Sequence, residues 1–376
     1  MRAGSARRSA RIAAALLPPL LLSLFFLSAA EAWLRWNRFG GDALTQPFDY
    51  MAPAWRDVDC FRPGPSGELM TPDCRMRYKG AFIATNGRGL HDREFDTTAP
   101  HYRIVVLGDS VSMAAGVERD ETYHAVLEKR VNTDLGAPGF VEFENFGRGG
   151  RTTAQQISDL EAALRMGPVD AALIALTPGS LWGNLRDASA CQDAAGQPAI
   201  GDADLRFHER AVRGLNPISN ALHWLEAKTG LWAFRVPQDA ARRIALSLRT
   251  DEKSRERSLA IEARATALFR ACAARLHEIA EREGIDLAWV VLWYQPSRHG
   301  EILETELREL GEVVLPTPHL LGAFPNREAM VIYPGEVHPN AAVHRAFAEK
   351  LRSSLGDLGW FERAADAQQR AAMSRP

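Results

Sequence analysis

The sequence predicts a three-layer α/β fold of the flavodoxin-like type, in which helices cover both faces of a parallel sheet. Two observations predict it: short apolar runs alternate with helical patterns along the chain, and the strongest run, residues 170–177, is apolar on both faces. A strand of that kind is typical of a parallel sheet between two helical layers. The expected strands are residues 104–107, 141–145, 170–177, 286–294 and 312–315.

The composition is that of a globular protein. Of the 376 residues, 46% are hydrophobic and 24% are charged, which suits one large domain with insertions. The formal net charge of −2 gives no reason to expect a nucleic acid as a partner. The histidines and cysteines show no spacing typical of a metal site, so we expect neither a metal nor a cofactor.

The N-terminus carries a membrane-targeting pattern. Four arginines precede an uncharged, apolar run at residues 12–30, which as a helix would cross about 28 Å. Positive charge before such a run keeps the N-terminus in the cytoplasm and sends the rest of the chain outside. We therefore expect residues 1–37 to be a cytoplasmic stub and a signal-anchor helix, with the main domain periplasmic or at the cell surface.

A cleaved signal peptide is the competing interpretation of the same run. Ala30-Glu31-Ala32 resembles the small-x-small pattern at which signal peptides are cleaved. The run is longer than the apolar region of a usual signal peptide, and Trp33 and Trp36 suit the membrane interface. These features favour a retained anchor.

Residues 38–80 are rich in Gly, Pro and Asp, which predicts an irregular extracytoplasmic segment. Cys60 and Cys74 lie in it and are candidates for a disulfide in an oxidising compartment. Cys191 and Cys272 could form a second pair. Cys272 lies on an apolar helical face, however, where a buried, unpaired cysteine is at least as consistent with the pattern.

A candidate nucleophile follows the first expected strand of the sheet. The run 104–107 ends at Gly108-Asp109-Ser110, and the carboxyl end of a central strand is where open α/β sheets present reactive groups. Ser110 could be both the nucleophile and, through its backbone N–H, an oxyanion donor. On its own the tripeptide is equally consistent with a plain turn. A glycine-rich loop, residues 145–152, follows the next strand, where backbone N–H groups can approach a ligand closely.

Three blocks together resemble the GDSL (SGNH) hydrolases, and the stretch from Thr85-Asn86 to Glu94 also resembles membrane-anchored bacterial members of that family. The three blocks are Gly108-Asp109-Ser110, then Asn145-x-Gly147-x-x-Gly150-x-Thr152, and His338-Pro339-Asn340 near the C-terminus. The resemblance covers about residues 80–190 and 285–357 and implies the SGNH hydrolase fold. It implies that Ser110 is the nucleophile and His338 the base. It also implies that the backbone N–H groups of Ser110 and Gly150 bind the oxyanion.

The chain departs from the pattern of that family in two places. The family's third block is Gly-x-Asn-Asp, whereas residues 177–180 read Thr-Pro-Gly-Ser, and Asn184 could supply the missing oxyanion donor only if the loop bulges. The family usually places Asp three residues before the histidine, where this chain has Gly335. Glu336 is the nearest substitute for orienting the imidazole, although a solvated loop glutamate fits the sequence about as well.

We expect the hydrolase-like domain at residues 81–361. A helical insertion is expected at about 190–284, with helices at 216–234 and 254–284. The apolar stripe of the second helix indicates a core contact rather than a lid or a face resting on the membrane. Residues 362–376 are polar, and we expect a disordered tail.

These observations lead to one expected function and two alternatives. We expect an extracytoplasmic serine esterase that hydrolyses a carboxylic ester, acyl or acetyl, through an acyl-Ser110 intermediate. Its substrate would be an ester-bearing small molecule, lipid or polysaccharide. An O-acyltransferase acting on an envelope polysaccharide would use the same intermediate. A binding or scaffold protein that keeps the fold without the chemistry is the third possibility, and the missing asparagine favours it.

Overall fold

The computed structural model describes residues 2–45, 60–64, 67–95, 101–185, 191, 221–222, 225–226, 228–229, 231–237, 252–320, 322–333 and 336–373. The chain divides into two compact units. One consists of Met1–Asp57 with Arg210–Arg249, and the other of Val58–Glu209 with Thr250–Pro376. The second unit begins well before the expected boundary at residue 81 and runs to the end of the chain.

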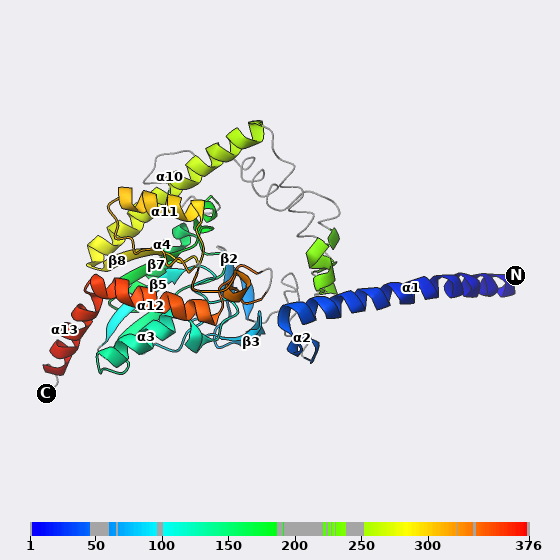
Figure 1. The fold of residues 1–376 in the computed structure, drawn as a ribbon, viewed down its shortest axis with the longest axis horizontal. Helices are drawn as coiled ribbons and strands as arrows, with labels where there is room; N and C mark the ends of the chain where they lie inside the picture. The colour runs from blue at the N-terminus through cyan, green and yellow to red at the C-terminus, as the bar shows by residue number, and fades with distance from the viewer. Residues whose placement is uncertain are drawn as a thin grey trace. The chain divides into compact units, whose positions relative to one another are not determined.

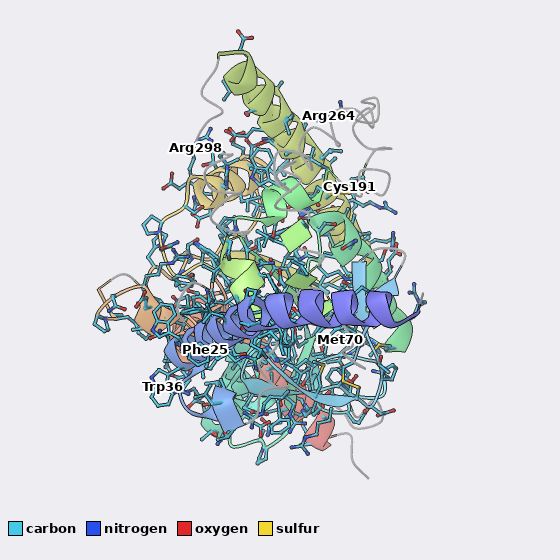
Figure 2. All side chains as sticks on the ribbon, turned by 90° about the vertical axis from the view of Figure 1, so that its right-hand side faces the viewer. Phe25, Trp36, Met70, Cys191, Arg264 and Arg298 are labelled. Atoms are coloured by element: carbon cyan, nitrogen blue, oxygen red, sulfur yellow. A yellow bond between two sulfur atoms is a disulfide. The ribbon has the colours of Figure 1, made fainter. Side chains whose placement is uncertain are left out.

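The N-terminal unit is built on one long helix, α1 (Arg2–Phe39), followed by the short α2 (Asp42–Thr45). Residues Leu17–Phe39 of α1, with a mean hydropathy of 1.6, are long and apolar enough to cross a membrane. A signal sequence would satisfy the same criterion of length and composition. The large apolar side chains of this stretch, including Phe25 and Trp36, are exposed (Figure 2).

The last turns of α1 carry a buried ion pair. Glu31 and Arg35 are 7% and 5% exposed, and Glu31 Oε1 lies 2.6 Å from Arg35 Nε. The other carboxylate oxygen of Glu31 accepts a hydrogen bond of 2.9 Å from the backbone N–H of Ala233. The guanidinium of Arg38 lies over the ring of Trp232, 4.6 Å from its centroid. Residues 231–237 therefore pack against the end of α1 within this unit.

The second unit contains the expected parallel sheet (Figure 1). Its strands are β5 (Tyr102–Gly108), β6 (Val141–Asn145), β7 (Ala171–Leu176) and β8 (Asp286–Val291), in the order β6-β5-β7-β8 and all parallel. The expected fifth strand is reduced to a single parallel bridge between Trp289 and Val314. Because β5 is a central strand, the residues that follow it lie at the middle of the carboxyl edge of the sheet.

Helices cover both faces of the sheet, which confirms the three-layer α/β architecture (Figure 1). One layer consists of α4 (Thr153–Met166), α10 (Glu252–Glu283) and α11 (Arg298–Glu309). The other consists of α3 (Tyr123–Asp134), α12 (Ala341–Asp357) and α13 (Trp360–Met373). Alternate residues of each strand face opposite layers, so that Val105 packs with the first and Val106 with the second. The apolar stripe of α10 is part of the core, as its spacing indicates.

The segment expected to be irregular contains two antiparallel hairpins. They are β1 (Phe61–Gly64) with β2 (Gly67–Met70), and β3 (Arg75–Tyr78) with β4 (Ala81–Ala84). A disulfide joins Cys60 and Cys74, as expected, with 5.5 Å between their Cα atoms. In the chain-entropy account, a closed loop of this size contributes about 3 kcal/mol to the free energy of unfolding.

One open alternative is decided, and one expectation is corrected. Cys191, labelled in Figure 2, is bonded to Cys272 of α10, with 5.0 Å between the Cα atoms. A buried apolar helical face accommodates a disulfide-bonded cysteine as readily as a free one, so the sequence pattern could not distinguish the two.

The C-terminal residues form helix α13 rather than a disordered tail, because Trp360 and Ala364 are buried against the layer of α3 and α12. Only part of the helix expected at 216–234 lies within the described residues.

Candidate active site

Ser110 lies in the tight turn that follows β5. A Cβ added to Gly108 would lie 2.1 Å from Ser112 Oγ and 2.5 Å from Ser112 Cβ, so a side chain at this position would displace Ser112. Asp109 is buried beneath the turn, where its carboxylate accepts hydrogen bonds from Val111 N at 2.9 Å and from Thr177 Oγ1 at 2.5 Å. Burial raises the pKa of Asp109 above its usual value. The Gly-Asp-Ser block thus turns the strand and fixes its end.

The glycine-rich loop after β6 packs directly against the serine turn. Asn145 Nδ2 donates to the carbonyl of Ser112 at 2.9 Å, and Asn145 Oδ1 accepts from Gly147 N at 2.9 Å. A Cβ added to Gly147 would lie 2.5 Å from Met113 N, closer than real Cβ atoms come. Asn145 and Gly147 therefore hold two loops together, and Gly150 follows them with a φ of +70°.

His338 reaches Ser110 from the other end of the unit, 228 positions along the chain. Its Nε2 lies 2.9 Å from Ser110 Oγ. The next residues fix the loop: Pro339 forms an antiparallel bridge with Val331, and Asn340 Oδ1 caps α12 by accepting from Val343 N at 3.1 Å. The asparagine of the His-Pro-Asn block therefore begins the helix that holds the histidine in place.

Glu336 lies on the other side of the imidazole. Its Oε1 is 3.0 Å from His338 Nδ1, and Oε1 also accepts from Val337 N at 2.8 Å. Its Oε2 accepts from Tyr333 OH at 2.8 Å and from Lys79 Nζ at 3.0 Å. Burial alone would raise the pKa of Glu336, but the hydrogen bond from His338 and the charge of Lys79 outweigh it and hold that pKa well below its usual range. The side chain is 13% exposed, so it is not a solvated loop glutamate.

A cavity of about 320 Å³ opens beside the serine and histidine. Gly150, Thr177, Gly179, Ser180 and Trp293 line it together with Ser110 and His338. This volume is at the lower end of the range for small-molecule sites. The structure thus brings Ser110, His338, Glu336 and Gly150 to one place at the carboxyl edge of the sheet.

Asn184 is not among the residues that line the cavity. Its Oδ1 accepts a hydrogen bond of 3.1 Å from Ala154 N, in the first turn of α4. Among the described residues its buried Nδ2 has no hydrogen-bond partner. Asn184 directly follows helix α5 (Ser180–Gly183), whose last residue packs closely against Thr152: a Cβ on Gly183 would lie 2.9 Å from Thr152 Cγ2. The loop that follows β7, where the GDSL (SGNH) pattern has its third block, lines the cavity with Thr177, Gly179 and Ser180.

Sequence reasoning missed Lys79, which touches both members of the Glu336–His338 pair. It lies in the turn between β3 and β4, and its Nζ is 3.1 Å from His338 Nδ1. A lysine in a hairpin turn carries no local pattern that points to a residue 257 positions away. Within the described part of the chain, no group of three His, Cys, Asp or Glu residues is arranged to hold a metal ion.

Comparison with family models and with curated proteins finds no match. Similar solved structures include TesA, which is 16% identical, covers 68% of this chain and 99% of its own, and has a TM-score of 0.38. The acetyl xylan esterase AlAXEase is 12% identical, with coverages of 67% and 99% and a TM-score of 0.37. A lipase/acylhydrolase from Enterococcus faecalis is 12% identical, with coverages of 68% and 96% and a TM-score of 0.35.

Proposed function

We propose that this protein is a serine esterase that hydrolyses a carboxylic ester through an acyl-Ser110 intermediate. The observation that carries the proposal is a continuous chain of contacts beside a cavity. It runs from Ser110 Oγ to His338 Nε2 over 2.9 Å, and from His338 Nδ1 to Glu336 Oε1 over 3.0 Å. A nucleophile, a base and a group that orients the base are the three parts that acyl transfer to serine requires.

In the proposed reaction, Ser110 Oγ attacks the ester carbonyl carbon while its proton passes to His338 Nε2. The carbonyl oxygen becomes an oxyanion, which the backbone N–H groups of Ser110 and Gly150 would bind. Collapse of this intermediate expels the alcohol, which takes the proton from Nε2. A water molecule then gives a proton to the same nitrogen and attacks the acyl carbon, releasing the carboxylic acid and restoring Ser110. Glu336 accepts the Nδ1–H bond throughout and stabilises the imidazolium.

The oxyanion site in this proposal is made mostly of backbone groups. Asn184 lies away from the cavity, so no asparagine supplies the third donor, and loss of one such donor typically costs about 3–4 kcal/mol of transition-state stabilisation. Ser180 lines the cavity, and its hydroxyl accepts from Thr177 N at 3.0 Å, which leaves the hydroxyl proton to donate. We expect turnover of simple esters to be slow for an enzyme of this type.

The test is hydrolysis of nitrophenyl acetate by the full-length protein in detergent. We expect a slow reaction above the uncatalysed rate that Ser110→Ala abolishes. Circular dichroism of Ser110→Ala should match the wild type, because the hydroxyl contributes no core contact. A rate that Ser110→Ala leaves unchanged, or a folded protein without any esterase activity, would contradict the proposal and favour a binding or scaffold role.

We also propose that α1 stays attached and anchors the protein outside the cytoplasm. Cleavage after Ala32 would remove Glu31, whose carboxylate pairs with Arg35 and accepts from Ala233 N. The two disulfides suit an oxidising compartment. The intact mass of protein extracted from membranes should therefore include the N-terminal residues. A mature chain beginning at Trp33 would refute the anchor.

A further inference from the structure

Lys79 occupies a backbone position that lysine rarely adopts. The turn between β3 and β4 consists of Lys79 and Gly80, which have φ values of +53° and +95°. Two-residue hairpin turns with positive φ at both positions favour Asn, Asp or Gly at the first. The turn itself therefore does not explain a lysine, which points to a role for the side chain.

The side chain of Lys79 is directed into the candidate site. It is 12% exposed, and its Nζ lies 3.0 Å from Glu336 Oε2 and 3.1 Å from His338 Nδ1. The turn is also fixed in place: a Cβ on Gly116 would lie 3.1 Å from the carbonyl oxygen of Lys79 and 2.6 Å from Ile332 Cδ1. The hairpin, the loop after Ser110 and the segment before His338 are therefore in close contact.

The ammonium of Lys79 opposes the use of His338 as a base in two ways. Nε2 can accept the Ser110 proton only when the imidazole proton is on Nδ1, facing Glu336. A lysine donor beside Nδ1 favours the other tautomer, in which Nε2–H faces Ser110. The same positive charge partly neutralises Glu336 and repels the imidazolium that forms during catalysis.

Among the described residues, the other titratable groups that face His338 do not supply this effect. Asp109 faces it from the end of β5, and burial raises the pKa of that carboxyl. His344 faces it from α12, and burial lowers the pKa of His344 to about 3, so it is neutral above pH 5. Glu336 is negative across the same range. Lys79 thus brings a positive charge to a site where these neighbours are neutral or acidic.

We propose that Lys79 is a positioning residue that weakens His338 as a base, so that the imidazole stays neutral, and the site keeps its activity, at more acidic pH. This inference rests on the proposed esterase function. The imidazolium is less favourable beside Lys79 than beside Glu336 alone, so more acid is needed to form it. The cost is a slower reaction at the pH values where the imidazole is already neutral, because part of it carries its proton on Nε2.

The experiment is the pH–rate profile of nitrophenyl acetate hydrolysis by the full-length protein, corrected with Ser110→Ala. In Lys79→Met, we expect the midpoint of the acidic limb, the pH at which the rate falls to half its plateau, to rise by about one unit. A like charge at this distance disfavours protonation of a neighbouring group by that amount or more, and the substitution removes this charge. The rate at pH 8 should be equal to or higher than that of the wild type. Lys79→Gln is a second neutral variant in case Lys79→Met does not fold.

Two variants control for charge and for packing. Lys79→Arg keeps the positive charge and should keep the wild-type midpoint. Arg75→Met removes a charge from the same hairpin, where the guanidinium lies over the ring of Phe82, and should not move it. A uniform change of rate at all pH values in both neutral variants, with no movement of the acidic limb, would overturn the inference while leaving the esterase standing. Absence of any Ser110-dependent hydrolysis would instead refute the esterase itself.

Discussion

Replacing Glu336 with glutamine is expected to lower esterase activity by about three to four orders of magnitude. The carboxylate accepts from four donors, and its Oε1 faces His338 Nδ1 at 3.0 Å. An amide in this position turns an N–H toward Nδ1, or loses the charge that stabilises the imidazolium, and in either case Nε2 becomes a poor base. The measurement is kcat/KM for nitrophenyl acetate with folding checked by circular dichroism.

Tyr333→Phe is the matched control for Glu336→Gln. It removes one hydrogen bond of 2.8 Å, from an uncharged hydroxyl to the same carboxylate, and keeps the charge of Glu336 and its contact with His338. We expect a loss of about ten- to a hundredfold, because one hydrogen bond to a charged group contributes about 1.5–3 kcal/mol. A Glu336→Gln rate near that of the wild type would mean that Ser110 and His338 act as a dyad or that another carboxylate orients the histidine.

Gly147→Ala is expected to lower the free energy of unfolding of the second unit by about 3 kcal/mol or more. Its new Cβ would lie 2.5 Å from Met113 N and 2.7 Å from both the carbonyl carbon and the Cβ of Ser112. Two of these neighbours are backbone atoms, so the loop after β6 and the serine turn must move apart. The measurement is the thermal unfolding midpoint, together with the esterase rate of whatever folded protein remains.

Gly356→Ala is the control for Gly147→Ala, because it makes the same chemical change in helix α12. Its Cβ would make ordinary contacts of 3.6 and 3.8 Å with the ring of Phe361. Alanine at a compatible helical position is neutral or stabilising. Equal unfolding midpoints for Gly147→Ala and Gly356→Ala would show that the two loops are not closely packed.

The sequence could predict the parts of the site that depend on strand ends and loop motifs. Ser110 follows an apolar run, and the carboxyl ends of parallel strands meet at one edge, so the meeting of Ser110 and His338 was predictable from topology. The sheet and both helical layers follow from the alternation of strand and helix patterns. Gly147 was also visible in the sequence, although the reason for it, a close approach to Met113, was not.

The rest depends on contacts that no local pattern encodes. Glu336 could not be told from a solvated glutamate, because its burial comes from Tyr333, Lys79 and the packing of the loop. Asn184 was expected near the oxyanion, yet its Oδ1 accepts from Ala154 N at the start of α4. Lys79 reaches the site from a hairpin in a segment that had been expected to be irregular. Each of these outcomes is decided by tertiary packing.

The most direct test of the central claim is to identify the covalent intermediate. The full-length protein is mixed with nitrophenyl acetate, quenched in acid within the first turnovers, digested and analysed by mass spectrometry. The account predicts an acetyl group on the peptide that contains Ser110, present in the wild type and absent in Ser110→Ala and, at the same times, in His338→Ala. Acetylation of a different residue, or Ser110-dependent hydrolysis without any acylated Ser110 under conditions that trap the intermediate, would contradict it.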